Sequence, residues 1–379
     1  MGRIGDATAR GDALRAPAPA VQAVLHPAAD RVEALAAEWA ALADKAAEPN
    51  PFAEHWFVAA SLRNLAGGRD IRLLEVRRGG RLIGVLPLAI ERGYAHLPVR
   101  FVQNWYHDHC FLGAPLIVAG EEAAFWTAAL ETLSASDWAP NFLHLRGLAE
   151  EGPVFRALGV GAVVHRRLRA MLQSELSPAA YFERAVRAKK RKELRRLRNR
   201  LADLGPVQVH TLNDEAELQS WCDSYFQLEA AGWKGREGSA LVCAPETRAF
   251  LRETLAAASQ AGRLQFLRLD VGGRPIAMLI NFLSAPGSFS FKTVFDEDFA
   301  RFSPGVLLQI ENLAILERAD IDWMDSCAID DHPMIDGFWT ERRSVVRVTI
   351  PLKGAGRHAV LALCRGLEKA SAAVRGKRL

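Results

Sequence analysis

The strongest constraint on the fold is a short sequence that occurs twice. Residues 79–86 are GGRLIGVL, and residues 272–279, 193 positions later, are GGRPIAML. Each copy follows an apolar or alternating run, IRLLEV or LQFLRLD, and precedes another one, PLAI or INFL. Glycine adopts the positive φ that a tight turn requires, so each copy predicts a β-hairpin.

The elements predicted around the two hairpins follow the same order. Two helical stretches precede each hairpin, and a third strand, a helix and a last strand follow it. In the first half these are residues 30–47, 57–62, 101–118, 121–135 and 141–148. In the second half they are residues 215–231, 244–260, 288–305, 306–319 and 321–329. A repeat of this length predicts two similar domains, not a solenoid.

Composition favours a globular protein of the cytoplasm. Apolar residues make up 50% of the chain and charged residues 24%, and no run approaches the about 18–20 apolar residues that span a bilayer. The five cysteines are scattered and lack CxxC spacing, which argues against a disulfide framework or a zinc ribbon. Residues 1–24 have no apolar core segment, so we expect a disordered lead-in and not a signal peptide.

The expected domains follow from the repeat. We place an N-terminal domain at residues 25–172, a C-terminal domain at residues 173–355 and a basic amphipathic helix or tail at residues 356–379. Each domain should contain a mixed, mostly antiparallel sheet flanked by helices, which makes the fold class α/β (α+β).

One segment concentrates positive charge. Residues 183–200 hold ten Lys or Arg and two Glu, in a chain whose net charge is +4. Apolar residues spaced by three and four predict one amphipathic helix over residues 184–200. Its cationic face could be merely solvated, or could contact anionic lipid, CoA phosphates or nucleic acid. Because no aromatic side chains interleave the basic residues, we expect no nucleic-acid partner.

The element order resembles the acyl-CoA N-acyltransferase fold of the GNAT superfamily, and most of all its tandem-domain, CelD-like (acetyltransferase 6) branch, which is distantly related to the Fem aminoacyl ligases. The matching segments are PNPFAEHWF (49–57), AKKRKELRRLRNRL (188–201), LEAAGWKG (228–235), GGRPIA (272–277), KTVFDEDFARFSPGVLL (292–308) and FWTERR (338–343). The resemblance implies an N-acyltransferase that uses acyl-CoA and no metal. Some relatives acylate the amines of envelope lipids, including the sphingoid base of bacterial ceramides.

The stretch ARFSPGVLLQIENLAI predicts a helix start suited to a pyrophosphate. Ser303 is a good N-cap and Pro304 suits the first helical position. The N–H groups of Gly305, Val306 and Leu307 would point out of the helix toward an anion. In the superfamily pattern R/Q-x-x-G-x-G/A, Arg301 fits, whereas Pro304 and Val306 stand at the glycine positions. A capped helix without a ligand is the alternative.

Direct acyl transfer requires a base for the amine and hydrogen bonds for the thioester oxygen. The resemblance implies that the strand at Thr293–Phe295 runs beside the thioester. It also implies that Glu229, at the end of a helix, leads into a loop in which Trp233 and Lys234 cover the acceptor. Glu229 could be the general base or could pair with Lys234. Lys292 could contact phosphate or the acyl carbonyl, or could only extend its ammonium into water.

Two further segments carry titratable groups near the expected cleft. Asp325 ends a strand, and the loop after it contains His332. Solvated charge is the default interpretation of this segment, and a role in acceptor binding or proton transfer is the alternative. In NWYHDHCFLGAPL, residues 104–116, an extended chain would put His107 and His109 on one face and Asp108 and Cys110 on the other. This arrangement disfavours a metal. The histidines are candidates to bind the acceptor or take its proton, and Asp108 to contact it. A hydrogen-bonded structural role of the histidines is the alternative.

The leading hypothesis is an acyl-CoA-dependent N-acyltransferase that acts on the amine of an envelope or lipid precursor, such as a sphingoid base. We expect a cytoplasmic protein that could visit the inner face of the cell membrane. A Fem-like aminoacyl-tRNA ligase is the enzymatic alternative, although residues 201–211 leave no room for the helical arm of that family. A nucleic-acid-binding or scaffold protein is the non-enzymatic alternative.

Overall fold

The computed structural model describes residues 19–376 apart from 239, 331 and 333, without the side chains of residues 233, 234 and 369–376. Its first half contains β1 (Val21–Pro27), α1 (Ala28–Arg31), α2 (Ala36–Ala43), α3 (His55–Leu65), β2 (Ile71–Arg78), β3 (Arg81–Tyr94), β4 (Leu97–Asn104), β5 (Leu116–Ile117), α4 (Glu122–Ala135), β6 (Phe142–Ala149), α5 (Pro153–Leu158) and β7 (Ala162–Leu172).

The second half repeats much of this order. It contains α6 (Pro178–Ala185), α7 (Ala188–Ala202), β8 (Val207–Thr211), α8 (Leu218–Ala231), α9 (Trp233–Arg236), α10 (Pro245–Gln260), β9 (Leu264–Val271), β10 (Arg274–Ser284), β11 (Gly287–Phe295), α11 (Pro304–Glu311), β12 (Trp323–Asp325), β13 (Glu341–Pro351) and α12 (Ala355–Gly376). The predicted hairpins are β2–β3 and β9–β10, and the turn glycines 79, 80, 272 and 273 all have positive φ.

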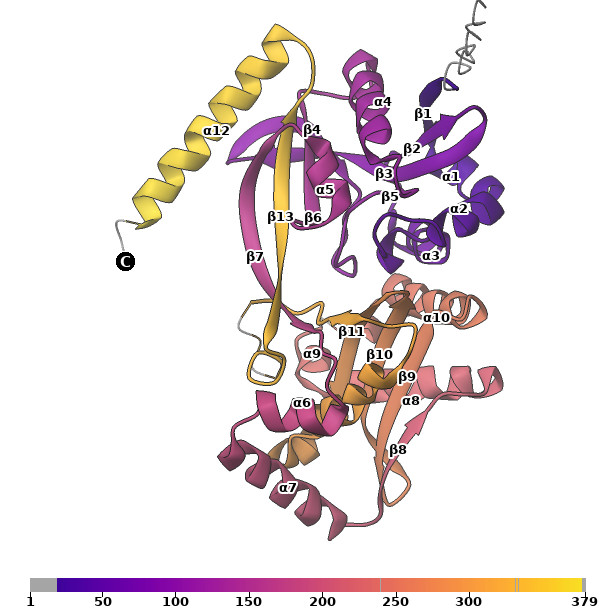
Figure 1. Cartoon of the computed structure of the whole chain (residues 1–379), viewed down its shortest axis with the longest axis vertical. Coiled ribbons are helices and arrows are strands. Elements are labelled where there is room, and N and C mark those ends of the chain that lie inside the picture. The colour runs from indigo at the N-terminus through magenta and orange to yellow at the C-terminus, as the bar shows by residue number, and fades with distance from the viewer. Residues whose placement is uncertain (1–18, 239, 331, 333, 377–379) are drawn as a thin grey trace, which may run out of the picture.

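One continuous sheet joins the two halves. Its strands follow the order β1-β2-β3-β4-β6-β13-β7-β12-β11-β10-β9-β8, and β5 pairs with β3. The mixed, mostly antiparallel sheet with flanking helices confirms the expected fold class. Figure 1 shows β7 and β13 as long strands that run from the upper half of the molecule into the lower half.

The position of β13 was not expected. The predicted boundaries assign residues 341–351 to the C-terminal domain, but β13 lies between β6 and β7 of the first half and pairs antiparallel with both. A hydrophobic pattern specifies which face of a strand is buried, but not which strands lie beside it. The two halves are therefore similar in element order and interleaved in space.

Aromatic side chains fill the space between the halves. Phe57 on α3 contacts Phe250 on α10, with ring centroids 5.5 Å apart. Phe52, just before α3, lies 5.7 Å from Phe289 on β11. These rings belong to one buried cluster that contains residues of both halves, so the two halves share a packed aromatic core.

Two predicted boundaries are wrong. Residues 1–18 lie outside the described part of the chain, but the expected lead-in of residues 1–24 overlaps β1, which begins at Val21 and pairs with β2. The basic helix expected at residues 184–200 is two helices, α6 and α7, separated by an extended Val186 with φ −108 and ψ 124. Val186 is 3% exposed, so burial of its side chain accompanies the break.

Candidate active site

Two neighbouring strands of the second half are paired only over a short stretch. β11 and β12 pair in parallel from Gly287 to Phe289. β12 then ends at Asp325, while β11 continues to Phe295. A register shift against β10 leaves Phe291 as a β-bulge, a feature that reorients neighbouring backbone groups beside many active sites. The end of β11 thus has no strand beside it on the β12 side within the described chain.

A small cavity lies against this end of β11. It has a volume of about 40 Å³ and is lined by Leu228, Glu229, Gly232, Thr293, Val294, Phe295 and Glu297. Glu229, on α8, is 4% exposed, and its Oε2 accepts a hydrogen bond from the backbone N–H of Leu241 at 2.8 Å. The structure therefore brings the candidate base and the strand Thr293–Phe295 together. Trp233 and Lys234 begin α9 next to this cavity, but their side chains lie outside the described structure.

The start of α11 differs from the expected anion site. Ser303 occupies the N-cap position in a left-handed conformation, φ 54, and its side chain makes no capping hydrogen bond. Its carbonyl accepts the N–H groups of Val306 and Leu307, both at 3.0 Å. The expectation that these two N–H groups point to a ligand is therefore wrong. Gly305 N–H has no partner in the described chain, and Met334 covers this residue: a Cβ on Gly305 would lie 3.0 Å from Met334 Sδ.

A larger hollow lies beside the same helix start. Its volume is about 620 Å³, and its lining includes Ser303 and Val306 from the α11 start and Arg187 and Lys190 from the start of α7. Guanidinium and ammonium groups bind phosphates well. Arg301 is not among the lining residues; its guanidinium lies over the Phe302 ring, 4.8 Å from the centroid. The cations that line this hollow are thus those at the start of α7.

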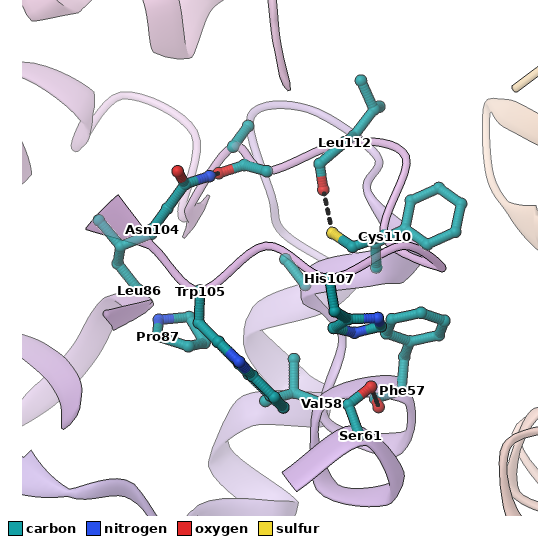
Figure 2. A pocket seen from close by; sticks show the side chains of 14 residues that line it. Phe57, Val58, Ser61, Leu86, Pro87, Asn104, Trp105, His107, Cys110 and Leu112 are labelled. Carbon is teal, nitrogen blue, oxygen red and sulfur yellow. Dashed lines mark hydrogen bonds between the residues drawn. The ribbon is translucent and has the colours of Figure 1, made fainter. Parts of the chain in front are cut away.

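The histidine segment is a turn, which corrects the extended conformation assumed from sequence. β4 ends at Asn104, and the N–H of Cys110 donates to the carbonyl of His107 at 2.9 Å. Figure 2 shows the His107 imidazole beside Phe57, and the two rings are stacked 5.8 Å apart. The His109 ring stacks on Phe250 at 5.4 Å. Both histidines therefore contact the aromatic core between the halves.

The surroundings of His107 make it a weak base. Burial, and then the charge of Lys292, lower the pKa of His107 to about 3. Its Nδ1 faces the N–H of His109 at 3.3 Å. A general base works best with a pKa near the operating pH, so the hypothesis that His107 takes the ammonium proton is disfavoured.

Lys292 extends from β11 toward the first half. Its Nζ lies 5.0 Å from the ring centroid of Phe291 and 5.6 Å from that of Phe111, in the loop after the histidines. These are cation–π distances. The lysine therefore lies at the boundary between the two halves, next to Thr293–Phe295 and near the loop that follows the histidine turn.

Asp325 is buried in an ion-pair cluster. The side chain is 0% exposed, and its carboxylate accepts from Arg169 at 3.2 Å, from Arg343 at 3.1 Å and from the N–H of Cys327 at 2.8 Å. Burial alone would raise the pKa of Asp325, but the two guanidinium groups hold it below its ordinary value. These contacts occupy both carboxylate oxygens, so the expected contact with the acceptor is not supported.

The other predicted residues lie farther from β11. Asp108 is exposed at the rim of an arginine-lined hollow. His332 is half-buried, and its carbonyl accepts the N–H groups of Ile335 and Asp336 at 3.0 and 2.9 Å. Among the described residues, no group of three or more His, Cys, Asp or Glu could hold a metal ion. Within the same residues, no helix is long and apolar enough to cross a membrane.

Sequence reasoning missed the arginines of that hollow. Arg146 on β6, Arg347 on β13 and His165 and Arg167 on β7 line it together. One signal was available: His165, Arg167 and Arg169 alternate along VVHRRLRAML, and alternating residues of a strand share a face. The partners on β6 and β13 were not accessible, because the insertion of β13 was not predicted.

Comparison with known families and structures identifies the class of the fold. Residues 188–332, which include α8, β11 and the α11 start, match the family described as an acetyltransferase (GNAT) domain. This match lies within the second half and supports acyltransferase activity. No curated protein matches the chain.

Solved structures share the fold over most of the chain. FemX aligns with a TM-score of 0.55 at 10% identity, over 86% of this chain and 98% of its own. The C-terminal domain of a putative lysylphosphatidylglycerol synthetase from Agrobacterium fabrum also gives 0.55 at 10% identity, over 87% and 96%. A conserved protein of unknown function from Bacteroides thetaiotaomicron gives 0.55 at 10%, over 84% and 97%. Similarity at this level of identity concerns the fold alone.

Proposed function

We propose that the protein is an acyl-CoA-dependent N-acyltransferase that transfers an acyl group directly to a primary amine. The observation that carries this proposal is that β11 continues beyond the end of β12, where Thr293–Phe295 line one cavity together with the buried Glu229. A hollow of about 620 Å³ with Arg187 and Lys190 in its wall adjoins the next helix. An oxyanion-stabilising strand, a base and a phosphate site are the parts that direct transfer requires.

The proposed division of roles follows from these positions. Bound acyl-CoA would supply a thioester carbonyl for the amine to attack and a thiolate that leaves. Glu229 takes up the proton that the amine loses, and N–H groups of Thr293–Phe295 donate hydrogen bonds to the carbonyl oxygen. Arg187, Lys190 and the N–H of Gly305 hold phosphate oxygens. Met334 has to move for Gly305 to make this contact, because its Sδ is already at the glycine.

The acceptor is proposed to be an amine of an envelope or lipid precursor, such as a sphingoid base. The exposed cations of α7 support a location on an anionic inner membrane surface, since Lys189, Lys192 and Arg195 point to solvent. Each basic residue near such a surface contributes about 1 kcal/mol of attraction. Trp233, Lys234 and the two histidines are proposed to border the acceptor.

The aminoacyl-tRNA ligase has less support. FemX shares the fold, but the connection between α7 and β8 spans only residues 203–206, so it contains no helical arm. Transfer from aminoacyl-tRNA without turnover of any acyl-CoA would establish this alternative in place of the proposal.

Release of free thiol from acyl-CoAs of two to eighteen carbons, with sphinganine as the amine, tests the proposal. Arg187→Gln should weaken CoA binding about tenfold or more, because a hydrogen bond to a charged group contributes about 1.5–3 kcal/mol. Lys189→Gln is the matched control: it removes a charge from the same helix outside the hollow. If CoA does not bind, or if both variants behave as the wild type, the assigned donor site is wrong.

A further inference from the structure

Three adjacent strands place cations side by side on one face. Arg347 on β13 lies directly opposite Arg146 on β6 and opposite His165 on β7. Like charges at opposed positions of a sheet repel and destabilise the pairing. Arg167, two residues beyond His165, lines the same hollow. The sheet therefore concentrates positive charge here at a cost to its own stability.

Cations outnumber acids among the described residues that line the hollow, and Asp330, outside the lining, acts on His165. The hollow has a volume of about 180 Å³, and Asp108 is the one acid among the described residues that line it. Asp325 lies close by but is committed to Arg169 and Arg343. The Nε of Arg146 is buried and has no hydrogen-bond partner in the described chain. Burial, and then the charges of Arg146 and Arg167, lower the pKa of Arg347, as expected for cations that lack a counter-ion.

The backbone is shaped around the same point. Register shifts occur on both sides of Arg347, between Val346 and Arg347 in the pairing with β6 and between Arg347 and Val348 in the pairing with β7. Gly147 lies in the first irregularity with φ 77, and a Cβ there would approach Gly113 N and the Tyr106 ring at 2.9 Å. Bulges of this kind redirect side chains next to functional sites, so the arginines are held by a specific local geometry.

The hollow adjoins β11 of the candidate active site. Phe111 forms part of its wall, and the carbonyl of Phe111 accepts a hydrogen bond from Arg169 Nη2 at 3.0 Å. On β11, Lys292 Nζ lies 5.6 Å from the centroid of the same Phe111 ring. A molecule in the hollow is thus one aromatic ring away from Lys292, the residue before Thr293.

We propose that this hollow binds an oxyanion, a carboxylate or phosphate, that the amine acceptor carries. The inference rests on the proposed function. Guanidinium groups match both oxyanions in geometry and charge. The hollow shares no lining residue with the one that contains Arg187 and Lys190, so the acyl donor and the acceptor each have their own anion site. The acceptor is then an amphoteric molecule, with its amine at Glu229 and its anion at Arg347.

Binding of inorganic phosphate to the full chain at saturating CoA is the first test, by calorimetry at pH 7.5. Saturating CoA occupies the donor hollow, so the remaining phosphate site should be the one at Arg347. Arg347→Gln and the more exposed Arg167→Gln should each weaken it tenfold or more. Arg166→Gln, on the opposite face of β7 where it pairs with Glu150, should not change it. Phosphate binding that CoA abolishes, or that all three variants retain, overturns the proposal.

Paired amines are the second test. The kcat/KM for sphinganine 1-phosphate should be at least tenfold higher than that for sphinganine, or the kcat/KM for 12-aminododecanoic acid at least tenfold higher than that for dodecylamine. Arg347→Gln should remove this difference by raising the KM for the anionic member of each pair alone. Equal kcat/KM within both pairs, or a raised KM for acyl-CoA in Arg347→Gln, overturns the acceptor assignment. A chain that binds phosphate at Arg347 but releases no thiol from any acyl-CoA would contradict the proposed function and leave an anion site without its acceptor.

Discussion

Replacing Asp325 by Asn should lower the free energy of unfolding more than replacing other acidic residues by their amides. The carboxylate is completely buried and lies where β12 meets β7, with the guanidinium of Arg169 at 3.2 Å and that of Arg343 at 3.1 Å. Asn retains an oxygen for the N–H of Cys327 but removes the negative charge, so two half-buried or buried cations face each other without a counter-ion. Removal of one partner from a buried ion pair costs about 3–5 kcal/mol.

The loss should depend on pH in a defined direction. Because the pKa of Asp325 is lowered in the folded protein, its charge stabilises the fold fully above its unfolded pKa of about 3.9. That stabilisation disappears as the pH falls through the lower, folded value. The difference between wild type and Asp325→Asn should therefore be constant from pH 8 to about pH 5 and should shrink below about pH 4.

Urea unfolding followed by tryptophan fluorescence measures the effect. Asp320→Asn is the matched control, since Asp320 pairs with Arg318 at 2.8 Å but is 53% exposed in its side chain. An exposed pair contributes about 0–1 kcal/mol. A loss below about 1 kcal/mol in Asp325→Asn, or a loss equal to that of the control, would refute the structural role and reopen acceptor binding by Asp325.

Three further outcomes are expected. Glu229→Gln should lower kcat about 10²–10⁴-fold, because the amide cannot act as a base. The Kd for CoA should stay within twofold of the wild-type value, because Gln keeps an oxygen for the Leu241 N–H. An unchanged kcat would exclude Glu229 as the base. Between pH 7.5 and 4.5, the Tm of His107→Phe should fall less than that of the wild type. In the wild type the pKa of His107 is about 3 in the folded state and about 6.5 in the unfolded state, so acid protonates the unfolded chain first and destabilises the fold. An equal fall in Tm for both proteins would contradict the buried, neutral state of His107. Gly305→Leu should raise the Kd for CoA at least tenfold, because the leucine side chain would meet Met334 and Phe295, whereas Gly305→Ala should change it little. Calorimetry with CoA measures both values. Wild-type affinity of the Leu variant would mean that the phosphates bind elsewhere.

The elements of the fold were largely accessible from sequence because their signals are local. The paired glycines and alternating flanks specify the hairpins, and α4 and α10 lie within a residue of their expected limits. The break between α6 and α7 was missed, since the basic pattern continues through Val186 and only tertiary burial of this side chain separates the helices. The insertion of β13 was missed for a related reason: its partners lie nearly 200 residues away, and periodicity carries no information on them.

The candidate site divides in the same way. Glu229 and Thr293–Phe295 were selected through a family resemblance, and both line the small cavity at the end of β11. The low pKa of His107 arises from Phe57 and Phe250, which are distant in sequence, so the histidine appeared to be a normal titrating group. Three free N–H groups were expected at the start of α11, but the Ser303 carbonyl accepts two of them. Leu307 makes the ordinary first helical hydrogen bond, which the expectation overlooked, and Val306 makes a second one. Each other error arises from a tertiary contact or a backbone angle that local sequence patterns do not specify.

The insertion of β13 also orders the events of folding. β6 and β7 are adjacent in the sequence, but in the sheet each pairs with a strand that the ribosome makes some 170–200 residues later. Until residues 341–351 emerge, both strands have an unpaired edge, and such edges are prone to intermolecular association. The first half therefore cannot complete its sheet as an isolated fragment ending at residue 172. Adding residues 338–354 as a separate peptide should restore its cooperative unfolding.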